Sequence, residues 1–244
     1  MVSKTDRAQR NVLAEAERRR SVLIRAGITA ALVVFALIVG IVVISGRDTP
    51  GAAAAPASVT DTGALRAAEP DVETLGGGQT PTRVLTIYED FQCPSCRAFE
   101  ATFGSALDEL RTSGAAAIDY QPIAILDRMS TTDYSTRAAN ASLCVADSSM
   151  DNWLRFHSSA YEQQPAEGGA GLTDDQLTEM AVAAGAPETV GECIADGTHT
   201  DWVASSTQSV LETNVNSTPT VLLNGEPLQL TTPEALTAAV LAIS

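Results

Sequence analysis

One stretch decides the fold: Tyr88-Glu89-Asp90-Phe91-Gln92-Cys93-Pro94-Ser95-Cys96-Arg97-Ala98-Phe99. It follows an apolar, β-favouring run over residues 83–88, which predicts a strand. Apolar residues then recur at helical spacing and predict a helix, at Phe99, Phe103, Leu107 and Leu110. A Cys-x-x-Cys pair therefore stands where a strand passes into a helix, a context that indicates a redox pair.

The position of Cys93 favours ionisation of its thiol. Pro94 suits the first helical position, where a missing backbone N–H costs nothing, and this places Cys93 near the N-cap. Free N–H groups and the positive end of the helix dipole stabilise a thiolate there. We therefore expect the pKa of Cys93 to lie well below the free value of about 8.5. Cys96, one turn later, can close a disulfide with Cys93 that exchanges with other disulfides through a mixed-disulfide intermediate.

Two other roles for this pair compete with redox chemistry. A zinc site needs four ligands, usually with a second Cys or His pair nearby. The remaining candidates form no such pair, so we expect no metal: Cys144, Cys193, His157 and His199. A purely structural disulfide is the other alternative. We expect the two histidines to lie on a helix face or a loop rather than beside Cys93.

The segment Glu-Asp-Phe-Gln-Cys-Pro-Ser-Cys over residues 89–96 resembles the DsbA-like branch of the thioredoxin superfamily. In particular, it is similar to the membrane-anchored DsbA-like proteins of Gram-positive and actinobacterial envelopes. The resemblance covers roughly residues 81–244. It implies an α/β thioredoxin fold with a helical insertion, thiol–disulfide exchange at Cys93 and Cys96, and no cofactor besides the redox-active disulfide.

The N-terminal segment predicts a membrane anchor. Residues 1–25 carry seven basic and three acidic side chains, a net charge of +4, and residues 26–45 carry no charge. Such a run at about 1.5 Å per residue spans the hydrocarbon layer of roughly 30 Å. It is longer than the apolar region of a signal peptide, although the small residues at 51–55 keep cleavage open as an alternative. The basic flank predicts a cytoplasmic N-terminus and an extracytoplasmic domain.

Residues 46–80 are rich in Gly, Ala, Pro, Thr and Asp without a sustained period, which predicts a flexible linker. Two alternatives remain: part of Asp61–Leu75 adds a strand or helix to the domain, or Val59–Ala67 forms a short helical turn. The remaining residues, 81–244, suffice for one domain with its own core.

The rest of the chain predicts a sheet interrupted by helices. Residues 115–126 favour a second strand, and the strand–helix–strand order implies a parallel pair with a right-handed crossover. From about 127 to 215 the pattern predicts no strand but five helices, at 132–147, 149–162, 173–185, 187–195 and 199–214. Thr173 and Gln176 carry a capping signal. This block matches the helical insertion that the resemblance implies.

Cys144 and Cys193 both lie in this block. If Cys93 pairs with Cys96, the remaining pairing is Cys144 with Cys193, which would close a loop of about 50 residues and stabilise the fold by around 4 kcal/mol. We favour this structural disulfide because the apolar surroundings of both cysteines indicate burial. A second redox pair that relays electrons to Cys93 and Cys96 is the alternative.

Near the C-terminus, Asn216–Leu228 predicts a hairpin turning at Asn224-Gly225, followed by a helix that starts near Thr232. The resemblance implies that Pro219 is the cis-proline that packs against the Cys-x-x-Cys pair in thioredoxin-like proteins. It also implies that the backbone of Thr218 pairs with an extended client segment by strand addition.

The chain departs from the family pattern at two positions. Many relatives bury a carboxylate six residues before the first cysteine, where it handles the proton of the second cysteine, but Ile87 stands there. Glu89, on the same strand face, Asp90 or a water would have to take that role. Ser95 replaces the histidine of the most oxidising members, so Pro94-Ser95 predicts an oxidant of moderate strength.

Charge and motifs together favour an enzyme outside the cell membrane. Residues 26–244 carry a net charge of −19 and no lysine, which excludes a basic footprint for nucleic acid. We expect oxidation of unfolded or reduced client proteins, with a membrane oxidase or reductase recycling the active site. The alternatives are a disulfide reductase or isomerase, and a non-catalytic thioredoxin-like binding module.

Overall fold

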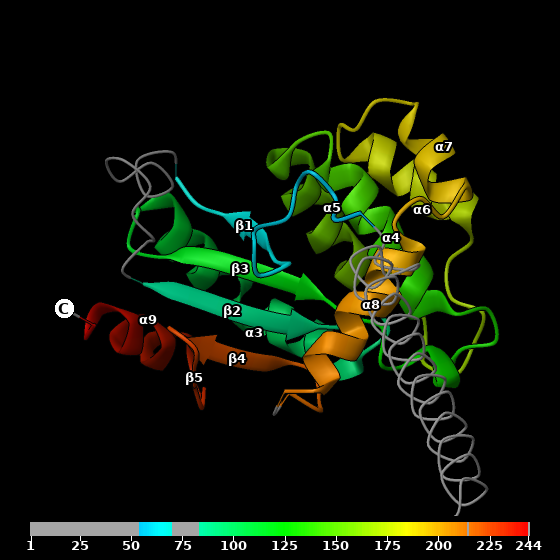
Figure 1. Cartoon of the computed structure of the whole chain (residues 1–244). Coiled ribbons are helices and arrows are strands. Elements are labelled where there is room, and N and C mark those ends of the chain that lie inside the picture. The colour runs from blue at the N-terminus through cyan, green and yellow to red at the C-terminus, as the bar shows by residue number, and fades with distance from the viewer. Residues whose placement is uncertain (1–53, 70–82, 214, 244) are drawn as a thin grey trace, which may run out of the picture. The chain divides into compact units, whose positions relative to one another are not determined.

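The computed structural model describes residues 54–69, 83–213 and 215–243 (Figure 1). The predicted basic segment 1–25, the predicted membrane span 26–45 and much of the predicted linker 46–80 lie outside these residues. Within the described ranges, no helix is long and apolar enough to cross a membrane.

A five-stranded sheet has the order β1-β3-β2-β4-β5. The central pair, β2 (Val84–Glu89) and β3 (Ala117–Pro122), is parallel, as the strand–helix–strand order predicted. β4 (Thr220–Leu223) pairs with β2 antiparallel, and the short β5 (Glu226–Pro227) completes the predicted hairpin. The carboxyl end of β2 thus leads directly into the short loop that ends at Cys93.

The two central strands differ in which of their residues are buried. β2 alternates, with Leu85, Ile87 and Glu89 buried on one face, whereas all six residues of β3 are buried because β1 and β2 flank it and helices cover it. The alternation places a carboxylate, Glu89, inside the protein at the end of an otherwise apolar strand face. A buried charge of this kind needs a partner.

The segment predicted as a flexible linker contributes a strand, which corrects that prediction for its middle part. β1 (Leu65–Ala67) pairs antiparallel with β3, so the alternative of an added strand within Asp61–Leu75 is the one observed. Arg66 forms an ion pair with Asp119 through two contacts of 2.7 Å, and Leu65 is fully buried. Backbone pairing, burial and this ion pair together hold the strand in the sheet.

The first helix of the described ranges, α3 (Pro94–Thr112), begins at Pro94 with Cys93 as its N-cap. Its buried face carries Cys96 and the stripe of Phe103, Leu107 and Leu110, as the helical spacing predicted. The C-terminal helix α9 (Pro233–Leu241) packs against α3 and starts after Thr232, whose side chain accepts a hydrogen bond from the Ala235 N–H. The sheet, α3 and α9 thus form the thioredoxin-like part of the fold.

Five helices form the insertion and gather at the end of the sheet where β2 and β3 finish (Figure 1). They match the predicted helices with shorter ends: α4 (Tyr134–Ala146), α5 (Met150–Glu162), α6 (Asp174–Ala183), α7 (Val190–Ala195) and α8 (Thr200–Leu211). A 3-10 turn, η1 (Asp127–Met129), precedes them. α6 begins with the predicted capping box of Thr173 and Gln176. The insertion packs against the sheet through α5, which contacts α3 and β1.

Candidate active site

Cys93 and Cys96 occupy the first turn of α3, and both are free thiols in this structure. Cys96 lies on the buried face of the helix, 2% exposed, and Cys93 is 7% exposed at the helix N-terminus. Pro94 and Ser95, between them, are exposed. The two cysteines therefore lie one helical turn apart, with Cys93 the nearer to solvent.

The surroundings of Cys93 lower the pKa of its thiol from 9.0 to about 5. The largest cause is a hydrogen bond from the Cys96 thiol, and the Thr218 side chain and the backbone N–H groups of Cys96 and Ser95 add to it, against an opposing effect of burial. These donors all stabilise a negative sulfur. Cys93 is therefore a thiolate at neutral pH, as its N-cap position predicted.

Cys96 is shifted in the opposite direction. Burial, together with the hydrogen bond to Cys93 and the charges of Cys93 and Glu89, raises its pKa far above the ordinary value. The reduced pair thus holds one proton, on Cys96, and one negative charge, on Cys93. This division of roles is the one that a nucleophile and a buried resolving thiol require.

Thr218 lies directly beside Cys93, and Pro219 follows it in the chain. The Thr218–Pro219 peptide bond is cis, as the resemblance implied, and Pro219 leads into β4. The Cys93 thiol donates a hydrogen bond to the Thr218 carbonyl oxygen at 3.3 Å. When Cys93 is ionised, its sulfur has no proton to donate to this carbonyl oxygen. The Thr218 side chain then stabilises the thiolate by a hydrogen bond.

Glu89 is buried and pairs with His157 of α5, a partner that the sequence did not reveal. His157 Nε2 lies 2.9 and 3.0 Å from the two Glu89 carboxylate oxygens, and His157 Nδ1 lies 3.9 Å from Glu100 Oε1. Burial alone would lower the pKa of His157, but the charge and hydrogen bond of Glu89 and the charge of Glu100 together raise it. His157 lies on a helix, as expected, but its ring is buried between two carboxylates, a setting that the sequence did not indicate.

Asp90, the other candidate for proton transfer, joins the active-site loop to the insertion. Its carboxylate accepts hydrogen bonds from the Ser135 hydroxyl at 2.6 Å and from the backbone N–H groups of Gln92 and Leu126. Burial raises its pKa to about 6 in spite of these bonds. These hydrogen bonds make Asp90 an anchor of the loop, whereas the charge of Glu89 acts on Cys96 and raises its pKa.

Gln164, just after α5, fastens the insertion to the active-site loop. Its Nε2 donates hydrogen bonds of 2.9 Å to the carbonyl oxygens of both Phe91 and Cys93. Gln92, in the same loop, donates a hydrogen bond of 2.6 Å to the carbonyl oxygen of Leu126, just before η1. The sequence gives no local signal for these long-range bonds, which fix the backbone on both sides of Cys93.

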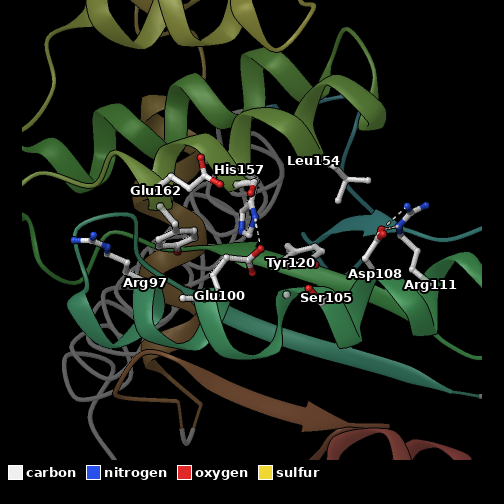
Figure 2. A pocket seen from close by; sticks show the side chains of 13 residues that line it. Arg97, Glu100, Ser105, Asp108, Arg111, Tyr120, Leu154, His157 and Glu162 are labelled. Carbon is white, nitrogen blue, oxygen red and sulfur yellow. Dashed lines mark hydrogen bonds and ion pairs between the residues drawn. The ribbon is translucent and has the colours of Figure 1, made fainter. Parts of the chain in front are cut away.

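A cavity of about 550 Å³ opens between α3 and α5. Glu100 and His157 lie at its wall and point toward each other, as Figure 2 shows, while an Asp108–Arg111 pair lies at the other end. Neither Cys93 nor Thr218 lines this cavity. The buried Glu89–His157 pair therefore has a nearby opening that is separate from the surface around Cys93.

Cys144 and Cys193 are joined by a disulfide that links α4 to α7. Among the described residues, one group places possible metal-ligand atoms within 4.8 Å of one another: Cys144, Cys193 and His199. Both sulfurs belong to the disulfide, so neither is a thiolate that zinc would require. His199 lies at the start of α8 and contacts Asp147 at 2.8 Å, away from Cys93.

Comparisons with known proteins agree with this geometry. A family model described as thioredoxin matches residues 72–242. DsbA from Mycobacterium tuberculosis, in its reduced form, is 38% identical and superposes with a TM-score of 0.67 over 74% of this chain and 91% of that one. A disulfide bond oxidoreductase from the same organism, DsbG, is 39% identical with a TM-score of 0.68 over 74% and 86%.

More distant structures and the curated relatives add less. MdbA, a thiol-disulfide oxidoreductase from Actinomyces oris, shares the fold with a TM-score of 0.61 at 23% identity, over 76% of this chain and 90% of that one. The serine/threonine-protein kinase PknE of Mycobacterium tuberculosis is 30% identical over 60% of this chain. The chain spans only 27% of the length of that relative. With a family model over most of its length and two DsbA-type structures at close to 40% identity, the chain belongs to the thioredoxin family, in its DsbA-like branch of thiol–disulfide oxidoreductases.

Proposed function

We propose that this protein oxidises dithiols of client proteins outside the cell membrane through a Cys93–Cys96 disulfide. The observation that carries the proposal is the opposite shift of the two thiol pKa values, about 5 for Cys93 and far above the ordinary value for Cys96. A stable Cys93 thiolate favours the reduced pair, and this makes the corresponding disulfide a good electron acceptor. A pKa of about 5 lies between those of DsbA, about 3.5, and thioredoxin, about 7, which supports an oxidant of moderate strength.

The reaction takes two exchanges. A client thiolate attacks Cys93 Sγ, the Cys93–Cys96 bond breaks, and Cys96 leaves with the electron pair and takes up one proton. The second client thiolate then attacks the client sulfur of the mixed disulfide, and Cys93 leaves as a thiolate. The client gains a disulfide and loses two electrons, which the cysteine pair holds until an oxidant recycles it.

Two further roles follow for residues around the pair. Thr218 and Pro219 form the surface along which an extended client segment would pair by strand addition, next to the Cys93 sulfur. Glu89 is the group that exchanges the Cys96 proton, since its charge already acts on Cys96 and it is buried on the same side of β2 as Ile87. It would do so from two residues beyond the position that other family members use.

The location is proposed from the sequence. The charged segment 1–25 and the uncharged run 26–45 support a single membrane anchor with the domain outside. In that compartment unfolded reduced proteins are the clients, and a membrane oxidase is the class of partner that would recycle the pair. A tethered position would keep the domain near such a partner.

The test mixes the oxidised full-length protein with a reduced peptide that contains two cysteines. We expect one peptide disulfide per protein, and no product with Cys93→Ala or with Cys96→Ala, because neither variant can form the Cys93–Cys96 disulfide; mass spectrometry measures both outcomes. Product formation by Cys93→Ala would contradict the proposal, and a failure of all forms to react would favour the binding module.

A further inference from the structure

We propose that His157 acts on Cys96 through Glu89, as a positioning residue. It takes the Cys96 proton from Glu89 and passes it to the cavity between α3 and α5. The inference rests on the proposed function, because it assigns the proton route of that same cysteine pair. The inference gives a residue of the helical insertion a part in the thiol–disulfide exchange, which otherwise involves residues of the thioredoxin-like part.

The contacts form a series from the interior to the cavity. Glu89 Oε1 and Oε2 lie 2.9 and 3.0 Å from His157 Nε2, and Glu100 Oε1 lies 3.9 Å from the opposite ring nitrogen. The side chains of Glu89 and His157 are 4% and 2% exposed, whereas that of Glu100, at the outer end of the series, is 19% exposed. An imidazole with a carboxylate at each nitrogen can take a proton at one and release it at the other.

Aromatic rings hold the imidazole in this orientation. His157 packs against four of them, with centroid separations of 4.7–6.0 Å: Phe91, Tyr120, Trp153 and Tyr161. The titratable groups that face it come from every neighbouring element, namely Glu89 of β2, Glu100 of α3, Tyr120 of β3 and Tyr161 of α5. The remaining charged side chains of the cavity are Arg97, Asp108, Arg111 and Glu162. Two acidic neighbours and a fixed ring favour a proton shared within the series.

The reaction needs such a route because Cys96 is buried. When Cys96 leaves the disulfide as a thiolate it takes up one proton, and in the reverse direction it must lose that proton before it attacks the mixed disulfide. A client over Cys93 and Thr218 would cover the surface on that side. The cavity lies along α3 and α5 and contains neither residue in its wall, so proton exchange there continues while a client is bound.

The experiment mixes oxidised glutathione with the reduced full-length protein, so that the reaction of Cys93 and the reaction of Cys96 are observed as two separate steps. First, the Cys93 thiolate attacks glutathione disulfide, releases one glutathione thiolate and forms a mixed disulfide. Cys96 then passes its proton to the Glu89–His157 pair and attacks Cys93 Sγ, which releases the second glutathione. Quenched-flow mass spectrometry follows both steps as the adduct appears and decays, over a range of pH.

The variant His157→Gln keeps a hydrogen-bonding group near Glu89 but cannot carry a proton. We expect its second step to slow by at least about 10-fold and to lose its pH dependence, while the first step changes by less than about 2-fold. Glu100→Gln should slow the second step less. Glu162→Gln, the same substitution at another glutamate that lines the cavity, should leave both steps unchanged.

A second measurement does not require a substitution of the buried His157. The chain has two histidines, so nitrogen NMR of the imidazoles, assigned with His199→Asn, gives the pKa of His157 in each redox state. We expect a higher pKa in the reduced protein, which carries the extra Cys93 charge. An identical pKa in both states, a normal second step in His157→Gln and Glu100→Gln, or equal slowing of both steps would overturn the proton route. Absence of the first step in the unaltered protein would instead overturn the proposed function.

Discussion

At the scale of single residues, two cysteines of the same helical turn ionise very differently. Cys93 receives hydrogen bonds from Cys96, Thr218 and two backbone N–H groups, whereas Cys96 faces the interior and the negative charges of Cys93 and Glu89. The first environment stabilises a thiolate and the second a thiol. The chemistry of the pair therefore depends on which groups each sulfur meets, and less on the spacing of the cysteines.

The pKa of Cys93 predicts how its reactivity depends on pH. Thiolate absorbance of the reduced protein should titrate with a midpoint near 5, and alkylation of Cys93 should be fast at pH 7 and fall below pH 5. Because the folded pKa lies below the value of 9.0, the reduced protein is stabilised at high pH and loses that stabilisation as the pH falls from 9 to about 5. The oxidised protein, which has no Cys93 thiol, should lack this loss.

Thr218→Val tests the contribution of one donor. Removal of the hydroxyl should raise the pKa of Cys93 from about 5 towards its ordinary value, because the thiolate loses a hydrogen bond. The absorbance titration measures the change. Thr220→Val is the matched control, since the Thr220 hydroxyl donates to the Ser217 carbonyl instead. An unchanged midpoint in Thr218→Val would show that the hydroxyl does not stabilise the thiolate.

At the scale of elements, β1 extends the sheet beyond the domain start that the sequence predicted. Three residues are too few for a period to be evident, and the polar Arg66 at their centre obscures the alternation. Its partner Asp119 lies 53 residues away, on β3. Pairing over such a distance leaves no local signal, so the sequence alone favoured a linker.

Arg66→Ala should lower the free energy of unfolding by about 2 kcal/mol, because it leaves the buried Asp119 carboxylate without its bidentate partner. Urea unfolding followed by circular dichroism measures the loss. Arg128→Ala, at an exposed position in η1, is the control and should change stability by less than about 0.5 kcal/mol. Equal stability of the two variants would show that the Arg66–Asp119 ion pair adds nothing to the stability of the fold.

At the scale of the whole molecule, the insertion and the thioredoxin-like part meet around the cysteines. Ser135 contacts Asp90, His157 contacts Glu89, and Gln164 contacts the backbone of Phe91 and Cys93. The insertion is thus part of the active site as well as a cover for the sheet. Within the insertion, the Cys144–Cys193 disulfide joins α4 to α7.

Loss of this disulfide should weaken the fold without changing the redox pair. For Cys144→Ala with Cys193→Ala we expect the free energy of unfolding to fall by about 2–4 kcal/mol, since a crosslink over 49 residues of chain is removed. Chemical unfolding of both forms measures the difference. If the double variant also shifts the potential of Cys93 and Cys96, the alternative of a second redox pair would gain support instead.

Much of the architecture could be predicted from local patterns. The Cys-x-x-Cys pair between a strand and a helix, the five helices of the insertion and the hairpin at Asn224-Gly225 each carry a period or a turn signal, and the structure shows them close to the expected residues. The role of His157 could not be predicted. Its contact with Glu89 joins residues 68 positions apart. The sequence around a helical histidine does not indicate which distant carboxylate will contact it.

The most direct test of the central claim is the reduction potential of the Cys93–Cys96 pair, measured for the full-length protein in glutathione buffers with Cys144 and Cys193 intact. A thiolate with a pKa of about 5 predicts a potential between about −120 and −180 mV, within the range of DsbA and protein disulfide isomerase. A potential near −270 mV, as in thioredoxin, would contradict dithiol oxidation and make the protein a reductase.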